Sequence, residues 1–231
     1  MLILSVDSSA TPASVCLYDD KVLAEYYINT KLTHSQTLTA MIESVLQITG
    51  KQAKDIDVFA VNSGPGSFTG VRIGVSAVKG MAYAMDRPCV AVSTLHSMIN
   101  NFLTENAVIC ACMDARRQQV YNAVYRISEG REELLCSDRA IAIDALIEEI
   151  QAYHEKVILV GDGAELVYNS CKELNNIVLA PANLRYQRAS AVAMIAAEKA
   201  NNHKTITAAA LMPSYLRLSQ AERERMEKQK G

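Results

Sequence analysis

The chain has 231 residues, of which 50% are hydrophobic and 21% are charged, as in globular proteins with one large domain or two smaller lobes. Its formal net charge of −2 gives no electrostatic reason to expect tight, direct nucleic-acid binding, although a local basic patch can still exist. The N-terminus does not resemble a signal peptide, and no apolar run approaches the ~20 residues of a membrane span. We therefore expect a cytoplasmic protein that has no membrane partner.

The first hundred residues predict the element order β-β-β-α-β-α. Asp19-Asp20 suits a hairpin turn, Thr33 and Gln36 have the spacing of a helix capping box, and Gly50 is a natural helix stop. Apolar periodicity gives the bounds of the elements. The predicted strands are 2–7, 14–18, 22–29, 56–61 and 88–92, and the predicted helices are 34–49, 71–85 and 94–103.

A glycine-rich segment, SGPGSFTGVRIG at 63–74, joins the strand 56–61 to the helix 71–85. Gly64, Gly66 and Gly70 can adopt positive φ angles, which other residues rarely do, or can let another group approach the backbone. A glycine turn before a helix can be a phosphate loop or only a tight turn, and the residues alone leave both interpretations open. The segment matches neither G-x-x-x-x-G-K-[ST] nor G-x-G-x-x-G in full.

The same order of elements returns in the second half of the chain. Strands are predicted at 107–113, 118–127, 133–136 and 157–160, and helices at 143–153, after the turn 161–163, and at 189–201. Two such halves predict a duplicated α/β fold of two lobes. We expect an N-terminal lobe at 1–104, a C-terminal lobe at 105–212, and a terminal segment at 213–231 whose charged residues 219–231 form a solvated helix.

Cysteine and histidine show no metal-site spacing. Cys110 and Cys112 lie two apart on one predicted strand, so their side chains face the same way, and we expect the six cysteines to be reduced and mainly buried. His96 has no histidine four residues before or after it. No metal site is expected.

Three segments resemble the bacterial TsaB (YeaZ) family, relatives of the threonylcarbamoyl transferase TsaD: 63–74, MDARRQQVY at 113–121 and PSYLR at 213–217. The resemblance implies an actin/Hsp70/sugar-kinase type of fold. It also implies a role in forming N6-threonylcarbamoyladenosine (t6A) at position 37 of tRNAs that read codons beginning with A. In that family the protein is an obligatory, non-catalytic partner of a TsaD-like transferase. A TsaE-like ATPase joins them, and the protein alone forms a homodimer.

The sequence departs from the pattern of the catalytic relative in two places. That relative carries H-x-x-x-H near the position of His96, and the phosphate loop D-x-G-[ST] is replaced here by Asp7-Ser8-Ser9-Ala10. We therefore expect no catalytic residues and no intrinsic cofactor, with ATP or ADP only at an interface of the complex and tRNA contacted only indirectly. Asp7 can face a nucleotide or merely end a strand. The nucleotide-cleft candidates are Asp7, Ser8, Gly64, Gly66, Gly161 and Gly163.

The sequence leaves two enzymatic alternatives open. The first is an independent nucleotide-binding, ATPase-like or kinase-like enzyme of the same fold. The second is a peptidase that uses Ser67, although GPGSF is not the G-x-S-x-G elbow and no spacing points to His34 or His96 as its base. Catalysis of any kind is disfavoured because the required parts are missing.

Two helices are predicted to bind a partner. Small residues recur along 71–85, and small side chains let a second helix approach closely. The helix at 34–49 carries alanine, threonine and Met41 beside its apolar stripe. A four-helix interface is the resulting hypothesis. Its candidate residues are Leu38, Met41, Ile42, Val45, Gly70, Val71, Gly74, Val75, Val78, Met81 and Ala82.

Overall fold

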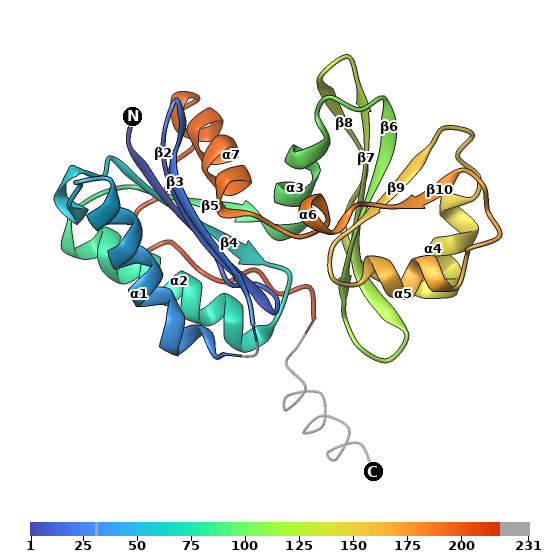
Figure 1. The fold of residues 1–231 in the computed structure, drawn as a ribbon, viewed down its shortest axis with the longest axis horizontal. Coiled ribbons are helices and arrows are strands. Elements are labelled where there is room, and N and C mark those ends of the chain that lie inside the picture. Colours follow the sequence, from blue (N-terminus) through green and yellow to red (C-terminus); the bar gives the residue numbers. More distant parts are fainter. Residues whose placement is uncertain (31, 218–231) are drawn as a thin grey trace, which may run out of the picture.

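The computed structural model describes residues 1–30 and 32–217, so the predicted helix at 219–231 lies outside the described residues. Two five-stranded sheets form two lobes that lie side by side (Figure 1). Their strand orders are β3-β2-β1-β4-β5 and β8-β7-β6-β9-β10, which are the same order written twice. The predicted duplicated α/β fold of two lobes is therefore confirmed.

The first sheet is antiparallel on one side of β1 and parallel on the other. Its central strand β1 is buried along its whole length, as expected for a strand covered on both faces. Helices α1 and α2 cover one face and α7 covers the other (Figure 1). The elements are β1 (Ile3–Asp7), β2 (Pro12–Asp19), β3 (Lys21–Asn29), α1 (His34–Ile48), the short helix η1 (Ala53–Asp55), β4 (Val58–Gly64), α2 (Phe68–Ala84), β5 (Cys89–Ser93) and α7 (Ala189–Asn201).

The second sheet has α3 on the face toward the first lobe and α4 and α5 on the other face (Figure 1). Leu95, Met98 and Ile99 of α3 are buried against β6 and β7. The elements are α3 (Thr94–Ile99), η2 (Asn100–Phe102), β6 (Ala107–Asp114), β7 (Gln119–Ser128), β8 (Arg131–Ala142), α4 (Ile143–Ile150), β9 (Val157–Val160), α5 (Ala164–Asn169), β10 (Ile177–Leu179) and α6 (Ala182–Arg185).

The predicted lobe boundaries need correction at both crossings between the lobes. Helix α7 was expected in the C-terminal lobe, but Ala189, Val192 and Ile195 pack on the first sheet. The chain then stays with that lobe, where Ile206 pairs with Cys89 of β5. Conversely, α3 was expected in the N-terminal lobe and packs on the second sheet. Each sheet has two apolar faces, and a helix distant in sequence covers the second face of the first sheet.

Local details also differ from the predictions. The capping box at Thr33 does not form, because Thr33 makes no side-chain cap bond and its hydroxyl lies 3.2 Å from that of Ser35. Strand β8 is longer than predicted, while β10 and α6 were not predicted. The side chains of Cys110 and Cys112 do face the same way, with their Sγ atoms 3.6 Å apart in the core.

Candidate functional site

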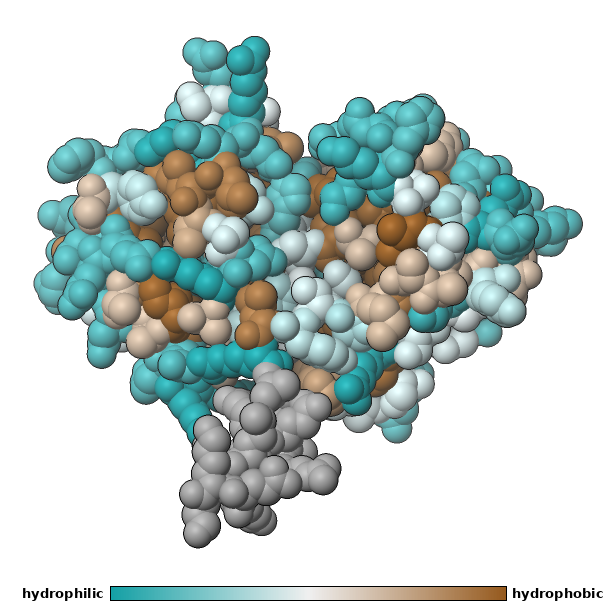
Figure 2. Space-filling model, turned by 180° about the vertical axis from the view of Figure 1, so that it is seen from behind, coloured by the Kyte–Doolittle hydropathy of each residue, from teal (hydrophilic) through white to brown (hydrophobic). Residues whose placement is uncertain are grey.

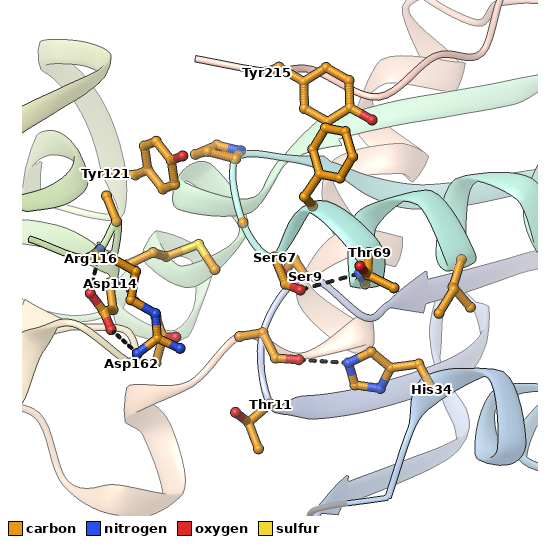
Figure 3. Close-up of a pocket in the computed structure, with 18 of the residues that line it drawn as sticks. Ser9, Thr11, His34, Ser67, Thr69, Asp114, Arg116, Tyr121, Asp162 and Tyr215 are labelled. Atoms are coloured by element: carbon orange, nitrogen blue, oxygen red, sulfur yellow. Dashed lines mark hydrogen bonds and ion pairs between the residues drawn. The ribbon is translucent and has the colours of Figure 1, made fainter. Parts of the chain in front are cut away.

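A cavity of about 660 Å³ opens between the two lobes. One wall combines the turn after β1 with the N-terminus of α2, and the other combines the end of β6 with Asp162 (Figure 3). Residues 214–217, which follow the segment that returns to the first lobe, complete the lining. All three segments that carry the family resemblance therefore meet at this cavity.

The glycine loop packs on the turn where a phosphate loop would lie. A Cβ atom at Gly66 would collide with the backbone oxygen of Ser9, and one at Gly70 would collide with the backbone oxygen of Ser8. The backbone N–H of Ser67 donates to Ser9 O at 2.6 Å, and Ser8 Oγ donates to Gly70 O at 2.9 Å. The backbone of the loop therefore covers Asp7 and Ser8 and occupies the carbonyl of Ser9, which favours close packing over a phosphate cradle.

This packing places most of the predicted nucleotide-cleft residues outside the cavity. Asp7 and Ser8 are 0% and 1% exposed, and of the six candidates only Gly66 lines the cavity. A Cβ at Gly161 would collide with Cys112 O, and one at Gly163 would come within 2.8 Å of Asp114 N, so both glycines serve strand packing. Gly64 lies under the backbone of Ser214, at the point where Ser214 N donates to Ser63 O at 2.7 Å.

Asp7 is the centre of a buried polar cluster that sequence reasoning did not resolve. Its Oδ1 accepts from Ser9 Oγ at 2.7 Å and from Asn62 Nδ2 at 2.8 Å. Asp7 Oδ2 and Asn62 Oδ1 have no partner among the described residues. Burial raises the pKa of Asp7 above its usual value, against the opposing hydrogen bonds of Ser9 and Asn62. This carboxyl group is enclosed and therefore does not face the cavity.

We expect Asp7→Asn to stabilise the fold increasingly as pH rises. Because the folded-state pKa is raised, the wild type loses stability as pH climbs from 3.8 through the raised value, and an amide has no such dependence. At neutral pH the gain should be on the order of 1–3 kcal/mol, the usual penalty of an unsatisfied buried polar group. Urea unfolding at pH 4, 6 and 8 measures it. The exposed Asp86→Asn is the matched control, and a pH-independent difference for Asp7→Asn would contradict the assignment.

The opposite wall is built from the MDARRQQVY segment. Asp114 Oδ1 accepts from the backbone N–H of Arg116 at 2.7 Å, and Asp114 Oδ2 pairs with the Arg116 guanidinium at 3.0 Å (Figure 3). Burial raises the pKa of Asp162 to about 6. Arg116, Arg117 and Gln118 all have positive φ values, of 63°, 55° and 56°. The sequence motif identified this segment, but nothing in it revealed the left-handed backbone.

His34, which lines the cavity, and His96, which does not, are both bonded to groups other than Ser67. His34 Nε2 donates to Ala10 O at 2.7 Å, and His96 pairs with Glu132 at 2.7 Å while stacking on Tyr125. Ser67 Oγ accepts from Gly70 N as the N-cap of α2. Within residues 1–30 and 32–217, no hydrogen bond joins Ser67 to a histidine, and no cluster of three or more His, Cys, Asp or Glu residues is placed to hold a metal ion.

The interface candidates lie mainly in the core of their own lobe. Val45, Val78 and Ala82 are 0% exposed, and a Cβ at Gly74 would collide with Ser8 Oγ. The prediction is corrected for these side chains because they face the first sheet, and Met81 is only half-buried. The other buried candidates are Leu38, Met41, Ile42, Gly70, Val71 and Val75.

The outward faces of the two helices carry different residues. On α2, Ser76, Gly80 and Tyr83 are exposed, and Tyr83 is 78% exposed. On α1 the exposed positions include Ala40 and Glu43. The sequence predicts the helical periodicity of α1 and α2 correctly. The apolar stripe that it assigns to a partner packs instead on the first sheet of the same lobe.

Comparisons with known proteins agree with the motifs. The family model described as "TsaD: tRNA N6-adenosine threonylcarbamoyltransferase" matches residues 21–225. The chain is 30% identical to the tRNA threonylcarbamoyladenosine biosynthesis protein TsaB of Bacillus subtilis, covering 100% of both chains. It is 29% identical to TsaB of Escherichia coli, covering 94% of this chain and 95% of the relative.

A solved structure shows the same fold. YeaZ from Pseudomonas aeruginosa superposes with a TM-score of 0.78 at 25% identity, covering 93% of this chain and 99% of that one. Among the described residues, no helix has the length and apolarity needed to cross a membrane. The full-length match and the three motifs meeting at one cavity lead to one conclusion: the chain belongs to the TsaB (YeaZ) family of tRNA threonylcarbamoyladenosine biosynthesis proteins.

Proposed function

We propose that the chain is a non-catalytic partner protein in t6A formation on tRNAs that read ANN codons, where it binds and stabilises a TsaD-like transferase. One observation carries the proposal: the backbone of the glycine loop covers Asp7 and Ser8 and occupies the carbonyl of Ser9. A nucleotide phosphate needs free backbone N–H groups and room at such a turn. Here Ser67 N–H is used by Ser9 O, and Gly66 and Gly70 fill the room. The site therefore supports packing of the loop in place of phosphoryl chemistry.

The same proposal places transferase binding on the outward faces of α1 and α2. These helices form the outer layer over one face of the first sheet (Figure 1). Ile48 of α1 and Tyr83 of α2 are 72% and 78% exposed, so each helix presents a large apolar side chain to a partner. Seen from behind, the molecule is mostly hydrophilic, with separate apolar patches on each lobe (Figure 2). The homodimer of the isolated chain would use the α1 and α2 face, and a TsaE-like ATPase would join the transferase complex.

We propose no intrinsic cofactor, with ATP or ADP bound only where the chain meets its partners. The cavity is lined by Asp114 and Asp162 as well as by Arg116 and Arg217, so it lacks the concentrated positive charge of a triphosphate site. An independent ATPase or a peptidase receives no support from the hydrogen bonds of Ser67, His34 and His96 described above.

The test is reconstitution of tRNA threonylcarbamoylation from purified components with and without the full chain. We expect t6A, measured by mass spectrometry of tRNA digests, only when the chain is present. In parallel, the isolated chain should neither bind ATP tightly nor hydrolyse it, as followed by calorimetry and phosphate release. Full t6A yield without the chain, or turnover of ATP by the chain alone, would overturn the proposal.

A further inference from the structure

Four arginines from three segments line the inter-lobe cavity or lie next to residues that line it. Arg116 and Arg217 line it, Arg117 follows on the same exposed loop, and Arg72 of α2 donates its Nε–H to the cavity-lining Tyr215 at 2.7 Å. Within the described ranges, Arg116 is the member of this set that forms an ion pair, with Asp114 at 3.0 Å. The lining itself is balanced, with Asp114 and Asp162 against Arg116 and Arg217, and Arg72 and Arg117 beside it add the excess positive charge at the mouth.

Aromatic rings stand among these guanidinium groups. The rings of Phe68 and Tyr215 stack with centroids 5.0 Å apart, and the Arg72 guanidinium lies 3.7 Å from the Phe68 centroid. Tyr215 is 43% exposed, and Tyr121 lines the wall across from it (Figure 3). Exposed aromatic rings next to arginine are the groups on which unpaired nucleobases stack. An acidic protein loop or peptide would be bound by the arginine charge alone and would not require the aromatic rings.

The loop that carries Arg116 and Arg117 holds an unfavourable backbone. Three consecutive residues with Cβ atoms, 116–118, are left-handed, a conformation that glycine adopts more readily. The loop is fixed in this form, because Ala115 N donates to Gln119 O at 3.0 Å and Ile143 N donates to Gln118 O at 3.1 Å. Arginine stands at two positions where glycine would cost less backbone strain, which indicates that the positive charge of these side chains has a function.

We infer that the cavity mouth binds a single-stranded segment of RNA. Arg72, Arg116, Arg117 and Arg217 contact its phosphates, and an unpaired base stacks on Tyr215. The inference rests on the proposed function, since the RNA substrate of threonylcarbamoylation is a tRNA with an unpaired anticodon loop. It replaces the expectation that tRNA meets this chain only indirectly.

The experiment measures binding of a fluorescein-labelled RNA hairpin, the anticodon stem-loop of an ANN-reading tRNA, by fluorescence anisotropy. The full chain is titrated alone and with the transferase, and a fully paired RNA duplex should bind more weakly. Tyr215→Leu should weaken hairpin binding roughly 5- to 100-fold through lost stacking. Arg117→Gly should lower the affinity and reduce the slope of log affinity against log salt concentration by about one, because one phosphate contact is lost. The same change should raise the Tm, because glycine adopts the left-handed backbone without strain. Arg131→Ala, at the start of β8 and at the end of the β7–β8 hairpin away from Gln119, should change neither the hairpin affinity nor the Tm.

The outcomes separate this inference from the proposed function. Absence of saturable hairpin binding by the wild type, alone and with the transferase, would overturn the inference, as would unchanged affinity in Tyr215→Leu and Arg117→Gly. Loss of transferase co-elution by these variants with unchanged hairpin affinity would assign the mouth to a protein partner and overturn it as well. If the hairpin binds at the cavity mouth but t6A forms fully without the chain, the proposed function is wrong and the inference stands.

Discussion

Gly70→Ala should destabilise the protein by about 3 kcal/mol or more, the range expected when an added methyl group meets packed backbone. The first turn of α2 lies directly on the turn after β1, and a Cβ at Gly70 would collide with the backbone oxygen of Ser8. Backbone cannot rotate away as a side chain can, so α2 must shift off the sheet. For a chain of this size, each kcal/mol lowers the Tm by roughly 2–4 °C. Thermal unfolding followed by circular dichroism measures the effect.

Gly80→Ala in the same helix is the matched control. Nothing lies within 4 Å of a Cβ built at Gly80, and the residue is exposed. Alanine there should stabilise α2 by about 0.5–1 kcal/mol, because glycine is the poorer helix former. The same glycine-to-alanine change is thus expected to lower the free energy of unfolding at position 70 and to raise it at position 80. If Gly70→Ala proved as harmless as Gly80→Ala, the glycine loop would not be a close-packing element, and the phosphate-loop interpretation would regain support.

The order of secondary structure was predictable because the strands and helices have clear periodicity. The apolar run 157–160 became β9 with the predicted bounds, and the alanine-rich run 189–201 became α7. The sequence motifs also located the site, since 63–74, 113–121 and 213–217 all reach the cavity. These features depend on neighbouring residues along the chain, which a sequence displays directly.

The contacts between distant segments were not predictable in this way. No local pattern tells that α7 covers the first sheet, since its buried alanines would suit either lobe. Likewise, glycine at 70 is compatible with a phosphate cradle and with a backbone collision, and only the position of Ser8 decides between them. The apolar stripes of α1 and α2 indicate a buried face without saying whether a sheet or a partner buries it.

That correction changes how the partner interface should be tested. Val78→Glu would place a charge in the core, where Val78 is 0% exposed, and the chain would fail to fold whether or not a partner binds there. A useful variant must change the outward face and leave the core intact. Gly80 meets this condition, because it is exposed and sits between Ser76 and Tyr83 on the outer side of α2.

Gly80→Arg should leave the monomer folded and weaken association with the transferase by roughly 10²- to 5 × 10³-fold. A bulky, unpaired charge buried in a helix–helix contact costs about 3–5 kcal/mol, while on the free helix arginine is a better helix former than glycine. Calorimetric titration with the transferase measures the affinity, and light scattering after size exclusion reports the homodimer. The same arginine at exposed Ala145 of α4, in the second lobe, is the control and should change neither association.

The two associations can respond separately, and each response has a structural meaning. Loss of both would show that homodimer and transferase complex share the outer side of α2, so the two states compete and homodimer formation lowers the free monomer available to the transferase. Loss of the homodimer alone would place the transferase elsewhere on the chain. Unchanged homodimer and transferase binding in Gly80→Arg, with the helix intact by circular dichroism, would remove α2 from both interfaces, because no tight helix contact at Gly80 can accommodate an arginine side chain unpaired.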